Sequence, residues 1–565
     1  MKHHLGVNKV WNKRRCVKGI KPKQYTLQKC GGKWEFLFLS NKSLPTDGEE
    51  RRLPPLSSAL GDNDKCKVFN KIENDRMKKI SKKKGVLPFS QNVPDRNAAS
   101  LHIVKKRVPL NVMFLKSQYL HSVSKRNQLI FWHSLFGNPT IVNKDAYEFL
   151  SQFSNPMNIN DILKLYKVTD GVSQLFETFR KSKFINPIGY NEREFLKGII
   201  QRRIEKGLNG SFIDYLELRV SEACNFNCSY CILQNAERIH KKDYKRFMDF
   251  HTAKKAVNIY FKLLKNNSKK KAEITFGGAE PTLNWSLIQK TIEYINSTYG
   301  SQLKCVFYIN TNFSLLNAKR IAFIKLHKIK VSPSIDGHNA LANDYTRKTK
   351  TVKGTFEVIM GTIRNLKKAG VKVPACSTTT NETNFKFINH RFIDWAKREG
   401  FREVNINIDV MNMADLNSDF VANRLIDLVR YASKLKVGLS GFWRRPAENI
   451  SYSLINHRTG FCGATRGDNL AVDPLGDIYS CGYSNKIIGS IPTFDSFFDN
   501  NGKYHNFLKE MSPIALKYCQ GCEIEGYCGG GCLATREFNE RNNNKIKQMC
   551  DIYKMMTRKL MSDLI

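Results

Sequence analysis

Three cysteines in one short segment are the residues of this chain best suited to chemistry. Cys224, Cys228 and Cys231 lie four and three residues apart in the stretch SEACNFNCSYC. Three thiolates at this spacing can bind three irons of a [4Fe–4S] cluster and leave the fourth iron open to another ligand. The same residues could instead form a zinc site without its fourth ligand, or a chance group of thiols.

A second and larger group of cysteines lies near the C-terminus. Seven cysteines fall between residues 462 and 550, and four of them form a CxxCxxxxxCxxxC pattern that starts at Cys519. Taken alone, this inner pattern is also typical of a zinc ribbon. Ten of the 15 cysteines belong to the two groups, and the N-terminal sequence has no apolar signal segment. The thiols therefore favour metal binding over a disulfide framework.

Repeated strand–helix units surround the first cysteine group. Six strand-like runs alternate with amphipathic helical segments, at residues 215–220, 273–278, 305–310, 330–337, 371–380 and 403–410. This alternation predicts an α/β fold with parallel strands, here a partial (β/α)6 TIM-like barrel. Such barrels hold their active sites at the C-terminal ends of the strands. The first cysteine group directly follows the first strand, where catalytic groups are expected.

The segment before the barrel predicts a separate winged-helix-like α+β domain. A strand-like run at 129–136 precedes a Gly-Asn-Pro turn, and Asn143 is a suitable N-cap for the helix that follows. We expect the run at 129–136 to be an exposed strand to which a peptide could add.

The predicted regions are 1–105, basic and disordered; 106–200, winged-helix-like; 201–415, barrel; 416–455, linker or bridge; and 456–565, a Cys-rich iron–sulfur domain.

The amino-acid composition indicates which binding partners and which cellular location to expect. The 92 Lys and Arg residues outnumber the 50 Asp and Glu residues and give a formal net charge of +42. Such a charge attracts nucleic acid or acidic peptides, but no nucleic-acid-binding motif accompanies it, so we expect a solvated basic surface. No run of about 18 apolar residues is present. We therefore expect a cytoplasmic protein with neither a membrane nor a nucleic-acid partner.

The first cysteine group resembles the signature of the radical S-adenosylmethionine (SAM) superfamily. Tyr230 directly precedes the third cysteine, which gives the family's CxxxCx-aromatic-C arrangement. The resemblance implies a [4Fe–4S] cluster that cleaves SAM reductively to a 5′-deoxyadenosyl radical. Segments at later strand ends resemble the family's SAM-lining segments, and the residues implied are Gly277, Gly278, Glu280, Pro281, Asn310, Ser334, Asp336 and Arg347. For Asn310 and Ser334, ordinary capping of strand ends is an equal alternative.

The C-terminal cysteines resemble the SPASM domain, an extension of radical SAM enzymes that modify peptides and proteins. The resemblance implies two auxiliary [4Fe–4S] clusters, one held by Cys462, Cys481 and Cys532 and the other by Cys519, Cys522, Cys528 and Cys550. The first set has only three cysteines. Its fourth ligand could be water, a small thiol, the substrate or His457.

Two activities are compatible with a SPASM-type enzyme. In sulfatase-maturating enzymes an Asp that serves as base follows the cysteine matching Cys481, whereas this chain has Gly482. The domain at 106–200 also resembles the element with which peptide-modifying enzymes bind a leader peptide. We therefore expect cross-link or thioether formation in a ribosomally made precursor peptide, with electrons from a ferredoxin or flavodoxin. The alternatives are a side-chain oxidase of the sulfatase-maturating type and a zinc-containing nucleic-acid-binding protein. No catalytic side chain is predicted.

Overall fold

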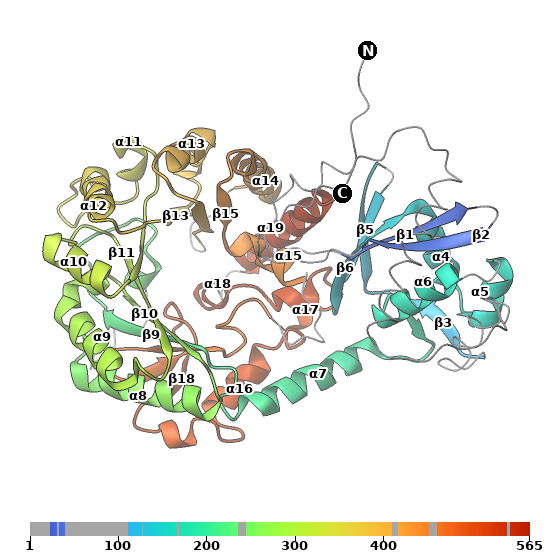
Figure 1. Cartoon of the computed structure of the whole chain (residues 1–565), viewed down its shortest axis with the longest axis horizontal. Helices are drawn as coiled ribbons and strands as arrows, with labels where there is room; N and C mark the ends of the chain where they lie inside the picture. The colour runs from blue at the N-terminus through green and yellow to red at the C-terminus, as the bar shows by residue number, and fades with distance from the viewer. Residues whose placement is uncertain are drawn as a thin grey trace, which may run out of the picture. The chain divides into compact units, whose positions relative to one another are not determined.

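The computed structural model divides the chain into two units. The N-terminal unit comprises residues 21–191, and the barrel unit comprises residues 192–564 (Figure 1). The structure describes residues 23–30, 33–39, 111–126, 128–166, 170–235, 245–409, 416–450, 460–539 and 543–565.

A five-stranded sheet organises the N-terminal unit. Its strand order is β2-β1-β6-β5-β4, with β1 at Lys23–Cys30, β2 at Lys33–Leu39, β4 at Leu120–Lys125, β5 at Gln128–His133 and β6 at Gly137–Asn143. Strands β1 and β2 fall inside the segment 1–105, for which the sequence predicts disorder, and β1 joins the sheet through parallel pairing with β6. The remainder of that segment lies outside the described residues.

Three helices and a small second sheet complete this unit. The helices are α4 (Lys144–Ser151), α5 (Ile159–Leu165) and α6 (Asp170–Lys181), and the sheet has the order β7-β3-β8, with β7 at Met157–Asn158, β3 at Met113–Lys116 and β8 at Ile185–Pro187. The side chain of Asn143 accepts a 3.1 Å hydrogen bond from the Ala146 amide, which confirms the predicted N-cap. Phe149 and Phe153 pack edge to face in the core.

The strand expected to be exposed lies inside the sheet instead. Strand β5 pairs with β4 on one side and β6 on the other, and its last four residues are buried. The prediction of an open strand edge at 129–136 is therefore wrong. Apolar residues on both faces of LIFWHSLF reflect burial in the middle of a sheet. The edge strand beside β5 is β4, which is half-buried to exposed along its length.

The barrel unit contains all six strands predicted for it. They are β9 (Tyr215–Ser221), β10 (Lys271–Gly278), β11 (Lys304–Thr311), β12 (Lys330–Pro333), β13 (Ala375–Thr380) and β14 (Glu403–Ile408). Strands β9 to β12 pair in parallel, as do β13 and β14. The bridge between Ser334 and Ser377 links the two groups.

Helices cover the outer side of this curved sheet (Figure 1). They are α8 (Phe250–Asn266), α9 (Trp285–Tyr299), α10 (Ala318–Leu326), α12 (Phe356–Lys368) and α13 (His390–Arg398). Asp249 caps α8 through a 2.7 Å hydrogen bond from the Thr252 amide. In each helix apolar residues at helical spacing are buried, so one side packs inward and the other faces solvent.

Two later segments extend the sheet beyond the six predicted strands. The region 416–455, expected to be a linker, contains α14 (Ser418–Lys434), β15 (Gly438–Ser440) and α15 (Arg445–Ile450). Strand β15 pairs in parallel with β14. From the Cys-rich region, β16 (Asn469–Val472) pairs in parallel with β9, and β17 (Asp477–Tyr479) and β18 (Ile487–Ser490) follow it. The C-terminal cysteines are thereby brought beside the first barrel strand.

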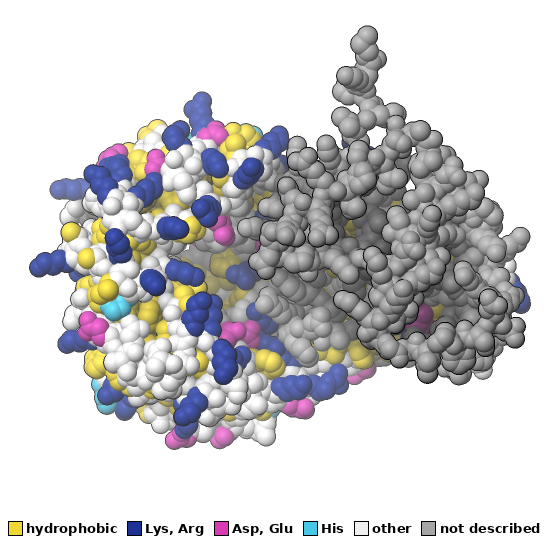
Figure 2. Space-filling model, viewed as in Figure 1, with side chains coloured by type: hydrophobic (Ala, Val, Ile, Leu, Met, Phe, Trp, Pro, Cys, Tyr) yellow, Lys and Arg dark blue, Asp and Glu magenta, His cyan; other side chains and the backbone are white. Residues whose placement is uncertain are grey.

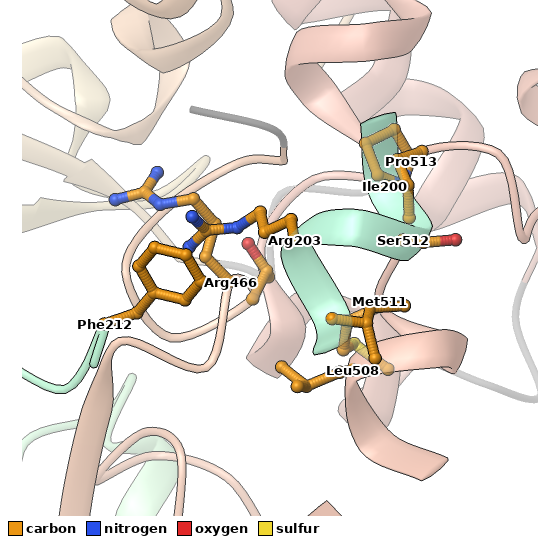
Figure 3. A pocket seen from close by; sticks show the side chains of 10 residues that line it. Ile200, Arg203, Phe212, Arg466, Leu508, Met511, Ser512 and Pro513 are labelled. Atoms are coloured by element: carbon orange, nitrogen blue, oxygen red, sulfur yellow. The ribbon is translucent and has the colours of Figure 1, made fainter. Parts of the chain in front are cut away.

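Ion pairs fix helix α7 (Glu192–Gly207) to the Cys-rich region. Arg203 and Arg466 lie on the same small pocket, shown in Figure 3. Both bind Asp468, at 2.6 Å and 2.7 Å. The guanidinium of Arg203 also lies 4.0 Å from the ring centre of Phe212. The remaining C-terminal helices are α16 (Lys503–Glu510), α17 (Glu525–Cys528), α18 (Leu533–Phe538) and α19 (Asn543–Ser562).

Charged side chains are scattered over the visible surface of the barrel unit (Figure 2). Lys and Arg side chains are spread over the face shown in Figure 2, with acidic side chains between them. Within the described ranges, no helix combines the length and the apolar character needed to span a membrane.

Candidate active site

The loop with the first three cysteines is held at the end of β9 by backbone hydrogen bonds. The amide of Asn227 donates to the Lys348 carbonyl at 2.8 Å, and that of Ser229 donates to the Thr346 carbonyl at 3.0 Å. On its other side, the Ala223 carbonyl accepts from the Glu280 amide at 3.0 Å. The loop is thus fixed between the segment after β10 and the segment that carries Arg347.

The three thiols of this loop lie close enough to influence one another. The pKa of Cys228 is raised to about 12, mainly by burial and to a smaller extent by Asp336 and the thiols of Cys231 and Cys224, against the opposing effect of Arg347. Burial also raises the pKa of Cys224, with a smaller contribution from Cys231. Clustered, desolvated thiols ionise with difficulty unless cations compensate their charge. This environment fits thiolates bound to iron.

Tyr230 connects this loop to two of the predicted SAM-site residues. Its hydroxyl donates to Oδ2 of Asp336 at 2.6 Å and accepts from Nη1 of Arg347 at 2.5 Å. Asp336 is fully buried and also accepts hydrogen bonds from Thr346 and from the Thr379 amide. Nε of Arg347 is buried and has no partner in the described structure. Arg347 therefore retains a buried donor that a bound ligand could use.

The glycine-rich segment after β10 approaches the cysteine loop closely. Gly278 has φ of 100° and sits at a bulge, and a Cβ atom there would overlap the carbonyl oxygen of Ser221. Only glycine fits this position without moving the backbone. The Ala279 amide donates to that carbonyl at 2.7 Å. Gly277 precedes this bulge and Pro281 begins the short 3-10 helix after it.

Glu280 braces the strand ends with its carboxylate. It is 1% exposed, and its oxygens accept hydrogen bonds from the amides of Thr282 and Asn312, at 3.0 Å and 2.8 Å. The hydroxyl of Thr311 donates to it at 2.6 Å. These bonds tie the segment after β10 to the end of β11. The side chain of Glu280 thus positions neighbouring backbone groups.

Asn310 and Ser334 lie at the ends of neighbouring strands. Asn310 is exposed and pairs with Ser332 of β12, while Ser334 is partly exposed with its Oγ 3.4 Å from that of Ser377. Asn312 belongs to the same strand-end segment but was not among the predicted site residues, and its side-chain amide donates a hydrogen bond to Oδ1 of Asn225 at 2.8 Å. Its position two residues after Asn310 was the available signal.

The seven C-terminal thiols gather into two sets that interact electrostatically within each set. One set is Cys462, Cys481 and Cys532, and the other is Cys519, Cys522, Cys528 and Cys550. Burial is the main cause that raises the pKa of Cys481 and of Cys528. These sets match the two that the SPASM resemblance implies. His457, the alternative fourth ligand of the first set, lies outside the described residues.

The twelve cysteines from Cys224 to Cys550 are free thiols. In the part of the chain that the structure describes, no three Cys, His, Asp or Glu side chains are close enough to share a single metal ion. A four-iron cluster is larger than one ion and holds its thiolates farther apart. The grouped thiols, the glycine cradle at Gly278 and the unpartnered Nε of Arg347 together fit a cluster with a bound SAM molecule.

Comparison with known proteins agrees with this geometry. The model of the Radical SAM superfamily matches residues 218–391. An uncharacterized protein of Methanocaldococcus jannaschii is 31% identical over 275 residues, which are 47% of this chain and 84% of that protein. The chain belongs to the radical SAM superfamily and is a radical SAM enzyme.

Its relatives include enzymes with SPASM-type features. The radical SAM cyclopropyl synthase TigE of Paramaledivibacter caminithermalis is 27% identical over 467 residues, covering 79% of this chain and 95% of that enzyme. A cysteine-type anaerobic sulfatase-maturating enzyme of Clostridium novyi is 23% identical, with 61% and 94% covered. The solved structure of native anSMEcpe with bound AdoMet has a TM-score of 0.51 at 20% identity and covers 62% of this chain and 98% of that chain, so the two share a fold.

Proposed function

We propose that this enzyme modifies a ribosomally made peptide by forming a cross-link or a thioether. The observation that carries the proposal is the match to a cyclopropyl synthase along 95% of that enzyme's length. A cyclopropyl group requires new carbon–carbon bonds, which is radical chemistry of the same kind as cross-linking.

Different residues of this chain would bind the iron–sulfur cluster and the SAM molecule. Cys224, Cys228 and Cys231 would hold the cluster, with Gly278 and Arg347 beside the SAM molecule. When bound, SAM and the cluster supply the 5′-deoxyadenosyl radical that abstracts a hydrogen atom. The two C-terminal cysteine sets would hold auxiliary clusters, and the protein orients the substrate and excludes water.

The N-terminal unit supplies a surface suited to the peptide's leader segment. Its edge strand β4 can accept an extended peptide as a further strand, through main-chain hydrogen bonds. The basic composition of the chain favours an acidic leader.

Maturation of sulfatases is the alternative, because sulfatase-maturating enzymes are among the relatives. The residue after Cys481 argues against sulfatase maturation. A Cβ atom at Gly482 would overlap the carboxyl group of Glu217, which already occupies this space. An acidic residue at this position would require the side chain of Glu217 to move, and the sequence has Gly482 there.

One experiment separates the two activities. The reconstituted enzyme is incubated anaerobically with SAM, dithionite and a candidate precursor peptide chosen from short reading frames near its gene, and in parallel with a sulfatase-derived peptide. We expect 5′-deoxyadenosine and a mass change in the first peptide, with no aldehyde. An aldehyde in the sulfatase-derived peptide, with the first peptide unchanged, would overturn the proposal.

A further inference from the structure

Glu217 is a carboxylate on the inner face of the barrel sheet. Leu216 and Leu218, its neighbours on β9, are completely buried, whereas Glu217 is partly exposed. Because side chains alternate along a strand, Glu217 points to the face of the sheet opposite Leu216 and Leu218. Its partners in the adjacent strands are Thr275 of β10 and Ala471 of β16.

Two glycines make room for this carboxylate. A Cβ atom at Gly277 or at Gly482 would overlap the carboxyl group of Glu217. Gly277 is the second-last residue of β10, and Gly482 directly follows Cys481. Glycines at both positions allow the carboxylate to occupy the space between the barrel strands and the C-terminal cysteine region. The amide of Gly482 donates a hydrogen bond to it.

The surroundings of Glu217 lie between the two cysteine regions. Tyr483, whose side chain is 48% exposed, interacts electrostatically with Glu217 and with the thiols of Cys481 and Cys231. Cys231 belongs to the loop that would hold the SAM-binding cluster, and Cys481 belongs to the first auxiliary set. A substrate placed between the two clusters would therefore meet Tyr483 and Glu217.

The charge of Glu217 is only partly compensated within the protein. Burial raises its pKa, while Arg219 and the Gly482 amide act in the opposite direction. Arg219 is completely buried and forms an ion pair with Glu222, so it is shared between two carboxylates. Tyr215 and Tyr483 also face Glu217 and interact with its charge. A partly buried carboxylate in this setting gains from a further hydrogen-bond donor.

We infer that Glu217 is the acidic contact for the substrate peptide, accepting a hydrogen bond from an N–H or O–H group of the residue that is modified. This inference rests on the proposed function. The carboxylate occupies the space that a side chain at position 482 would fill. An acidic group therefore lies beside Cys481, but it belongs to strand β9 and not to the loop that carries Cys481 and Gly482.

The test combines removal of the charge with its relocation. Glu217→Gln keeps the shape and removes the negative charge. Glu217→Ala removes the group, and the double variant Glu217→Ala with Gly482→Asp returns a carboxylate from the neighbouring loop. Glu273→Gln is the matched control, since Glu273 lies on β10 and pairs with the exposed Lys271. Each reconstituted variant is assayed for binding of the candidate precursor peptide, for modification of that peptide, and for SAM cleavage without peptide.

We expect Glu217→Gln and Glu217→Ala to weaken peptide binding about tenfold or more, because hydrogen bonds to charged groups are strong. The double variant should recover part of that loss, and SAM cleavage without peptide should persist in all variants. Wild-type binding and turnover in Glu217→Gln, or no recovery in the double variant, would overturn the inference alone. Failure of the wild-type enzyme to bind any such peptide would instead overturn the proposed function, and this inference with it.

Discussion

The hydroxyl of Tyr230 lies 2.6 Å from Oδ2 of Asp336, although 106 residues separate them in the chain. The same hydroxyl accepts a hydrogen bond from Arg347. Tyr230 directly precedes Cys231, so this contact fixes the cysteine loop to the end of β12 and to the cation beside it. The aromatic residue before the third cysteine therefore positions the cysteine loop, in addition to being part of the family's sequence motif.

Replacing Tyr230 by Phe should loosen this connection without removing a cysteine. The loss removes one hydrogen bond from the buried carboxylate of Asp336 and one from Arg347, and a hydrogen bond to a charged group contributes about 1.5–3 kcal/mol. We expect weaker SAM binding, by about tenfold, with the iron content retained; equilibrium binding of SAM and iron analysis measure both. Tyr294→Phe is the control, since that hydroxyl bonds Asn258 at 2.6 Å on the outer helices. Equal SAM affinity in both variants would contradict the role given to Tyr230.

Replacing Cys228 by Ala should abolish reductive SAM cleavage. Only two thiolates would remain in the loop, too few to hold the cluster with one open iron. We expect a loss of about four iron atoms per chain and no 5′-deoxyadenosine with dithionite, while the auxiliary clusters persist. Cys305→Ala is the matched control, because Cys305 lies on β11 outside both cysteine groups. Production of 5′-deoxyadenosine by the Cys228 variant would refute the assignment.

The sequence predicts local elements well here and long-range pairing poorly. The periodicity of YLELRV is enough to predict β9, and the cysteine spacing is enough to identify both cysteine groups. Nothing in that periodicity indicates that β16, more than 240 residues later, pairs with β9. Glu217 could therefore be placed on a strand, but not beside Gly482. Likewise, the apolar run at 129–136 predicts a strand and leaves open whether it is an edge or a central one.

Removing the N-terminal unit should separate peptide recognition from SAM chemistry. The cysteine loop and the SAM-site residues all lie after residue 191, within the barrel unit. We expect deletion of residues 1–191 to weaken binding of the precursor peptide strongly and to leave SAM cleavage without peptide intact. Anisotropy of a labelled peptide and chromatography of 5′-deoxyadenosine measure the two effects. Unchanged peptide affinity after the deletion would show that the leader binds elsewhere.

His505 should make the stability of the enzyme depend on pH. The residue lies on α16, is 7% exposed, and accepts a 2.7 Å hydrogen bond at Nδ1 from the Asn501 amide. Burial lowers its pKa, and Lys509 lowers it further. At pH 7.5 the ring is neutral in the folded and unfolded states. As the pH falls below about 6.5, the unfolded chain takes up a proton that the folded protein resists.

The contribution of neutral His505 to the free energy of unfolding is therefore fully present above pH 6.5 and is lost progressively as the pH falls toward its folded-state pKa. The total loss is about 1.4 kcal/mol for each unit that separates the pKa values of His505 in the unfolded and folded states. His505→Asn keeps an acceptor but cannot be protonated in this range, so it should lose less stability between pH 7.5 and 5.5 than the wild type. Unfolding of the reconstituted enzyme at both pH values measures the difference. His251→Asn, on the exposed side of α8, should behave as the wild type. Parallel losses in the wild type and the His505 variant would show that another group controls the acid sensitivity.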